Sequence, residues 1–166
     1  MPAALATQDE VPGDAYMIRA PAMSISELLR FVTASDAIVE PSPWGPHEWL
    51  CRPGLTDAKH LQVVRVSMPP GTGHAFHRHP AMEEIIYVVA GRAEQWVDRA
   101  SRVLGPGEIA HIPTDVVHGT YNTGKDTLVF LAILSPALFD GPALVDVSGE
   151  ATEDLEAKVK MYLARQ

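Results

Sequence analysis

The middle of the chain consists of short runs of apolar and alternating residues that are separated by turns rich in Gly and Pro. In residues 60–68, Val64, Val66 and Met68 share one face of an expected strand, because successive side chains of a strand point to opposite faces. Residues 126–135 are apolar with little interruption, which predicts a strand buried on both faces. Further strands are expected at residues 49–52, 84–89, 93–97 and 102–108.

Helical patterns are found toward the two ends of the sequence. Ser24 and Glu27 have the spacing of a capping box, and the apolar positions behind them predict a short helix. Residues 150–166 place acidic groups early and basic groups late, as the helix dipole prefers, and predict a C-terminal amphipathic helix. Its apolar stripe consists of Leu155, Val159, Tyr162 and Leu163.

Many short strands bounded by one helix at each end predict a mainly β fold, an antiparallel sandwich or jelly-roll β-barrel. With 166 residues the chain fits one domain and can bury a core without disulfide bonds. Residues 1–22 are expected to form a flexible N-terminal arm and residues 23–147 the barrel. Residues 148–166 are expected to pack as a helix on the barrel or on a partner.

Charge and cysteine content argue against several classes of protein. The formal net charge is −8 and no cluster of Lys and Arg occurs, which argues against nucleic acid and anionic membranes as partners. Cys51 is the single cysteine, so an internal disulfide is impossible and a cytoplasmic location is expected. No apolar run has the length of a membrane span, and the N-terminal residues lack the pattern of a signal peptide.

Two histidines and a carboxylate have a metal-binding spacing within residues 71–91. His77 and His79 are one residue apart, so both imidazoles leave the same face of a strand. After a turn at Pro80, Glu84 begins the next expected strand and can face the two histidines. His118 follows a Pro-containing turn farther along the chain and can supply a fourth ligand.

These two segments resemble the paired motifs of the cupin superfamily, in the form found in small single-domain bacterial cupins. The first motif is matched by Gly71, His77, His79, Glu84 and Gly91. The second motif is matched by Gly107, Pro113, His118 and Asn122. Asp115 stands where the second motif has Gly, and Asp tolerates the turn conformations that favour Gly.

The resemblance implies a jelly-roll barrel with a metal held by His77, His79, Glu84 and His118. The ligand set suits one divalent transition metal ion: Fe, Mn, Ni, Co, Cu or Zn. An octahedral ion would keep two open positions for oxygens of a substrate or for dioxygen. A structural metal, or a remnant site that holds none, stays open as an alternative.

Other polar residues are weaker candidates for the site. Tyr121 and Gln95 could supply a proton or a hydrogen bond to substrate, and His111 could support a metal ligand. His74 is expected at the surface or rim, because it lies three residues before His77. Surface positions are expected for Glu83, His47 and His60, and a turn-fixing role for Asn122. The substrate pocket is expected to be lined by Val66, Met68, Ile86, Val88 and Phe130.

Three functions are consistent with these features. The favoured hypothesis is a metal-dependent enzyme that acts on a small oxygen-rich molecule. Within it, dioxygenase-like oxidoreductase chemistry is favoured, because small cupins with this three-His, one-Glu set resemble quercetinase-like and related dioxygenases. The second is a non-oxidative isomerase, lyase or decarboxylase of a sugar or keto acid. The third is a cupin that binds a small ligand without converting it. A homodimer is expected, since exposed sheet edges need cover.

Overall fold

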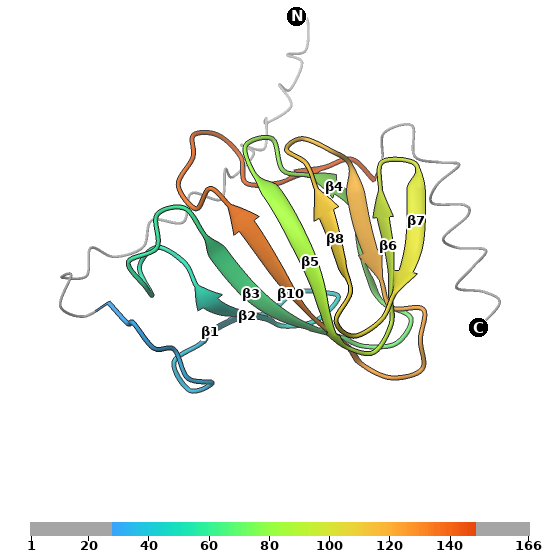
Figure 1. The fold of residues 1–166 in the computed structure, drawn as a ribbon, viewed down its shortest axis with the longest axis horizontal. Helices are drawn as coiled ribbons and strands as arrows, with labels where there is room; N and C mark the ends of the chain where they lie inside the picture. Colours follow the sequence, from blue (N-terminus) through green and yellow to red (C-terminus); the bar gives the residue numbers. More distant parts are fainter. Residues whose placement is uncertain (1–27, 149–166) are drawn as a thin grey trace, which may run out of the picture.

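The computed structural model describes residues 28–148 as two antiparallel β-sheets (Figure 1). In spatial order, the first sheet contains β1 (Ile38–Glu40), β2 (His47–Cys51), β3 (Gln62–Met68), β10 (Leu128–Ser135), β5 (Glu83–Ala90) and β8 (Ile109–Ile112). The second contains β11 (Val145–Asp146), β4 (Gly73–Arg78), β9 (His118–Tyr121), β6 (Ala93–Val97) and β7 (Ala100–Leu104). The prediction of a mainly β jelly-roll sandwich is confirmed.

The described residues contain no helix, and therefore none that could cross a membrane. The expected N-terminal helix does not extend over residues 28–32, where Leu29 instead forms an isolated bridge with Thr56. Its first residues, the N-terminal arm and the predicted C-terminal helix lie outside the described part of the chain.

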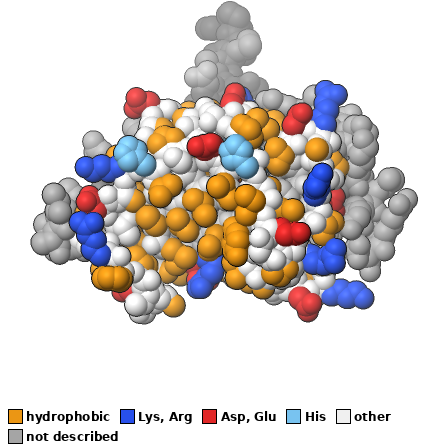
Figure 2. Space-filling view, viewed as in Figure 1, with side chains coloured by type: hydrophobic (Ala, Val, Ile, Leu, Met, Phe, Trp, Pro, Cys, Tyr) orange, Lys and Arg blue, Asp and Glu red, His pale blue; other side chains and the backbone are white. Residues whose placement is uncertain are grey.

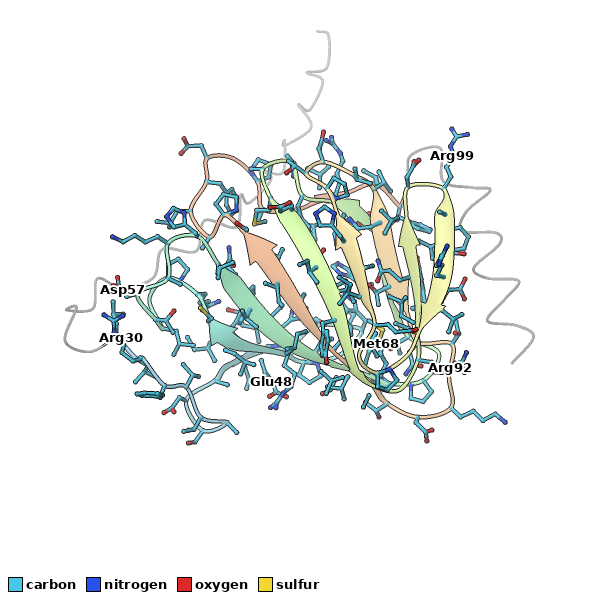
Figure 3. All side chains as sticks on the ribbon, in the orientation of Figure 1. Arg30, Glu48, Asp57, Met68, Arg92 and Arg99 are labelled. Carbon is cyan, nitrogen blue, oxygen red and sulfur yellow. The ribbon has the colours of Figure 1, made fainter. Side chains whose placement is uncertain are left out.

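Strand alternation places the main core between the sheets. On β5, Glu84, Ile86 and Val88 are buried while Glu83 and Tyr87 are exposed, as their alternation predicts. The strands of the first sheet converge toward one end of the molecule and spread apart toward the other (Figure 1). Met68, labelled in Figure 3, is fully buried near the converging end.

The prediction that residues 126–135 are buried on both faces is wrong. Along β10, Leu128, Phe130, Ala132 and Leu134 are buried, whereas the residues between them are only partly buried. The buried set faces the second sheet, and the other set lies on the outer face of the first sheet. Figure 2 shows hydrophobic side chains gathered on this outer face. Tyr87, Val89 and Ile109 are exposed there, with Ile109 at 53%.

Two residues of the second motif fix the turns around β9. Asp115 adopts a left-handed backbone with φ of 65°, and its N–H donates to the carbonyl of His79 at 2.9 Å. Asp therefore fills the position that favours Gly, as expected. The fully buried Asn122 amide donates to the carbonyls of Met68 and Asp126 at 2.8 and 2.9 Å. The turn-fixing role predicted for Asn122 is confirmed.

Candidate metal centre

Four side chains from both sheets converge at one point between them. His77 lies on β4, His79 follows that strand, Glu84 lies on β5 and His118 lies on β9. Each offers one ligand atom, and these atoms all lie within 4.8 Å of one another. His77 and His118 are direct cross-strand partners, which places their rings on the same inner face. All four residues are buried, with exposed fractions of 7% or less.

The backbone fixes the orientation of all three imidazole rings. The Nδ1 atoms of His77, His79 and His118 lie 2.7, 2.6 and 2.9 Å from the carbonyl oxygens of Ala75, Ala143 and Val116. A carbonyl oxygen can only accept, so each Nδ1 carries the proton and donates it. Each Nε2 therefore presents its lone pair in the neutral ring, as in histidines that bind metals.

The carboxylate of Glu84 lies against two of these rings. Its Oε2 is 2.8 Å from Nε2 of His118 and 3.5 Å from Nε2 of His79. Burial alone would raise the pKa of Glu84, but His118 and His79, when they are protonated at Nε2, lower it below its usual range. The side chain is therefore an anion inside the protein, where a charge requires a positive partner.

The electrostatics of the centre favour a cation. Burial lowers the pKa of His77 well below its usual value, and the neighbouring histidines add to this effect. Burial acts in the same direction on His79, but Glu84 outweighs it and raises the pKa of His79 overall. Protons and a metal ion would compete for the same Nε2 lone pairs, so metal binding would release protons.

The residues fit a divalent transition metal. Glu84 Oε2 and His118 Nε2 are buried and make no hydrogen bond within the described residues. Three imidazole nitrogens and one carboxylate oxygen suit Fe, Mn, Ni, Co, Cu and Zn. The orienting carbonyls complete the arrangement expected around such an ion.

A cavity of about 610 Å³ opens beside the four candidate ligands. Its walls are largely apolar and come from the inner faces of β2, β3, β5 and β10, together with the segment 137–144. Such a volume suits a small organic molecule. The candidate ligands lie in its wall, so a bound molecule could reach the metal position directly.

His74 lines this cavity, although the sequence indicated a surface or rim position. The pairing of β4 with β9 shifts register between His74 and His77, which adds a residue on β4. Because of this extra residue, His74 points to the same face as His77, although the two are three positions apart. The His74 ring stacks on those of His77 and Trp44, with centroid distances of 3.8 and 4.1 Å.

His47 also lines the cavity and is not a plain surface residue. It pairs with Val66 across β2 and β3 and therefore shares the inner face with that residue. His47 and Trp49 are two residues apart on one strand and therefore share a face, and both line the cavity. This spacing could have placed His47 beside Trp49 from the sequence. His60 is exposed, as expected.

The three weaker polar candidates lie outside the cavity wall. Tyr121 points to the outer face of the second sheet and packs with Phe76 and Trp96. Its separation of three residues from His118 already implied the opposite face. Gln95 accepts a 2.6 Å hydrogen bond from Thr120, which does line the cavity. Gln95 is therefore separated from the cavity by Thr120.

His111 lies on the outer face of the first sheet. Its Nε2 is 3.1 Å from Oε2 of Glu83, and both side chains are more than half exposed. The surface pair expected for Glu83 is thereby confirmed. His111 does not support a metal ligand, because the alternation of β8 directs Ile112 inward and His111 outward.

The expected apolar lining is only partly correct. Val66, Ile86 and Phe130 line the cavity. Met68 and Val88 belong to the buried core but not to the cavity wall. Both lie toward the converging end of the strands, where side chains fill the space between the sheets.

Residues 64–134 match the family profile described as the cupin domain. Germin-like protein 3-8 of rice is 39% identical over 77 residues, which cover 43% of this chain and 34% of that protein. Dimethylsulfoniopropionate lyase DddQ of Ruegeria pomeroyi is 36% identical over 91 residues, covering 54% of this chain and 44% of that protein. The chain thus spans less than half the length of either relative.

A solved structure of Bacillus subtilis oxalate decarboxylase, described with Mn(II) centres, has a TM-score of 0.60 at 21% identity. The similarity covers 79% of this chain and 35% of that one, and at this identity it shows the fold alone. Together with the family profile and the two motifs, the fold defines the class. Residues 64–134 thus form a cupin domain.

Proposed function

We propose that the chain is a metal-dependent enzyme that converts a small oxygen-bearing organic molecule bound in the cavity beside His77, His79, Glu84 and His118. The observation that carries the proposal is the convergence of four buried ligand atoms within 4.8 Å, in which Glu84 Oε2 lies only 2.8 Å from His118 Nε2. Two lone pairs at this distance require a positive charge between them or beside them.

Dioxygenase-type oxidation is the chemistry that this site supports best. A redox-active divalent metal would act as a Lewis acid and bring the substrate and O₂ together. Dioxygenation places both atoms of O₂ in the organic product, and the organic substrate supplies all the electrons that reduce O₂, so the reaction needs no separate reductant. The apolar cavity wall excludes water, which protects reactive species from hydrolysis.

A second candidate is non-oxidative cleavage, such as a lyase or decarboxylase reaction. The sequence similarity to dimethylsulfoniopropionate lyase DddQ, at 36% identity, favours it. The same open metal positions would hold a carboxylate or carbonyl group and stabilise the negative charge that develops in such reactions. This reaction would proceed without O₂.

Elemental analysis of protein purified without added metal is the first test. We expect close to one divalent transition metal ion per chain, and its loss in the His77→Ala, His79→Ala double variant. Absence of metal from both, with the fold intact by circular dichroism, would overturn the proposal.

Oxygen uptake then separates the two chemistries. The loaded protein is mixed with a panel of diketones, flavonols and catechols in a sealed cell that records O₂. Uptake that matches product formation supports dioxygenation, whereas product formed under nitrogen supports the non-oxidative reaction. Ligands that bind and are recovered unchanged under both atmospheres would contradict an enzyme and indicate a binding protein.

A further inference from the structure

A row of cavity-lining residues leads across the first sheet from the candidate metal centre to the partly buried Arg52. Glu84 on β5 pairs with Leu134 on β10, and Leu134 pairs with Gln62 on β3. Arg52 directly follows Cys51, which pairs with Val63, so Arg52 ends this row beside Gln62. Three strand spacings separate the backbones of Glu84 and Arg52, a distance of about 14 Å.

The wall between the two ends of the row is mainly apolar. The neighbouring row pairs Ile86, Ala132, Val64 and Trp49 across the same four strands. All of these residues line the cavity. The Nε2 atom of Gln62 already donates to the carbonyl of Ala137 at 3.3 Å. A molecule lying along the row would therefore meet polar groups mainly at its two ends.

Arg52 is held rigidly at the far end. Its Nη1 donates to Oε1 of Glu40 at 2.8 Å, and the guanidinium carbon lies 5.1 Å from the ring centre of Trp49. Trp49 donates from Nε1 to Oε2 of Glu40, also at 2.8 Å. The Arg52 side chain is only 12% exposed. Such a braced guanidinium loses little conformational entropy when it binds a ligand.

The hydrogen bonds of this group define what it can recognise. Both oxygens of Glu40 have donors, whereas Arg52 makes a single side-chain hydrogen bond among the described residues. A guanidinium carries five N–H donors and no acceptor, so donors remain for a ligand in the cavity. Glu40 neutralises the charge of Arg52, which removes the advantage of an anionic partner. An uncharged oxygen acceptor is therefore favoured.

We propose that Arg52, braced by Glu40 and Trp49, is a specificity-determining residue that binds a neutral carbonyl or hydroxyl oxygen at the end of the substrate remote from the metal. The substrate class is then an elongated, largely apolar and uncharged molecule with metal-binding oxygens at one end and an oxygen acceptor at the other. This inference rests on the proposed function, because the metal centre anchors the first end.

Matched catechols test the inference. One series carries 4-alkyl chains of increasing length, a second ends the same chains in a methyl ketone, and a third ends them in a carboxylate. Titration calorimetry under nitrogen measures their dissociation constants with the metal-loaded protein. At the best chain length we expect the ketone to bind about tenfold more tightly than the matched alkyl compound.

Three variants assign this preference to the proposed residues. Arg52→Met keeps the stem against Trp49 and is expected to abolish the tenfold difference while the alkyl compounds bind as before. Glu40→Gln keeps an acceptor but removes the negative charge, and is expected to shift the preference toward the carboxylate series. Arg65→Met is the matched control, since Arg65 pairs with Glu48 on the opposite face of the same strands. Figure 3 shows Glu48 at the margin of the molecule beside β2.

The two proposals fail in different ways. If the alkyl catechols bind in a metal-dependent manner but the ketones gain nothing, or if Arg52→Met keeps the full difference, the role of Arg52 is overturned alone. If none of the series depends on the metal or on Glu84, the proposed function falls, and the inference falls with it.

Discussion

Glu84 and His118 come from opposite sheets, and their Oε2 and Nε2 atoms meet at 2.8 Å in a buried position in the cavity wall. The carbonyl of Val116 holds the His118 ring so that this nitrogen cannot turn away. The fold therefore builds a site of negative potential in its interior before any ligand arrives. Such preorganisation reduces the cost of binding a cation.

Replacement of Glu84 by Gln should weaken metal binding. Gln keeps the shape of the side chain but removes its charge, so we expect at least about a 100-fold loss of affinity. Competition with a chromophoric chelator measures this change. Glu83→Gln is the control, because Glu83 lies next to Glu84 in sequence but is exposed and pairs with His111. Equal losses in the two variants would contradict the assignment.

Metal removal should also lower the free energy of unfolding of the parent protein but not of Glu84→Gln. A ligand present at 100 times its dissociation constant stabilises the native state by about 2.7 kcal/mol. Urea denaturation with and without a chelator measures this difference.

His74 should make the metal-free protein sensitive to acid. Burial lowers the pKa of His74 from 6.5 to about 3, with neighbouring histidines adding to the shift. Between these values the unfolded chain takes up a proton that the folded chain does not, so stability falls as pH falls. The contribution is about 1.4 kcal/mol per pH unit. This loss of stability is absent at pH values well above 6.5, because His74 is then neutral in both the folded and the unfolded chain.

Denaturation of chelator-treated protein from pH 6.5 to pH 4.5 tests this effect. His74→Phe keeps a ring between Trp44 and His77. The slope of the unfolding free energy against pH should then fall by the equivalent of about one proton taken up on unfolding. His60→Phe, at an exposed position, is the control for the substitution itself. An unchanged slope in His74→Phe would show that His74 is solvated in solution.

Gly91 should tolerate a side chain poorly. Its φ is +80°, and a Cβ would lie 2.8 Å from both Leu128 Cα and the Thr127 carbonyl oxygen. Gly107 has a similar φ of +87° with nothing within 4 Å. Gly107→Ala thus measures the conformational cost, about 1–2 kcal/mol, and Gly91→Ala adds the collision with β10. Equal melting temperatures for the two variants would contradict this close approach.

The expected homodimer remains a prediction. The outer face of the first sheet carries Tyr87, Val89 and Ile109 in exposed positions, and Figure 2 shows this apolar surface. Light scattering at micromolar concentration should give twice the monomer mass, and Ile109→Glu should lower it. Lys125→Glu, at an exposed loop position, is the control for the charge change. A monomeric mass for the parent protein would contradict the prediction.

The sequence by itself identified the four candidate metal ligands, because local alternation pairs His77 with His79 and both motifs resemble those of cupins. Alternation put His77 and His79 on one face and turned Glu84 inward while Glu83 stayed outside. The same rule, applied to the three-residue separation from His118, would have excluded Tyr121 from the site. The apolar alternation also predicted most of the strands, since one face of each had to be buried.

Only the tertiary structure decided what surrounds that centre. The bulge that brings His74 into the cavity arises from the register between β4 and β9, which no local pattern encodes. The row from Glu84 to Arg52 depends on the strand order β5, β10, β3, β2, which joins segments far apart in the sequence. Whether an apolar residue lines the cavity, like Phe130, or fills the core, like Met68, follows from where the sheets converge. Spacing along the chain fixes which face a side chain takes, but only the packing of the two sheets fixes which residues meet across the space between them.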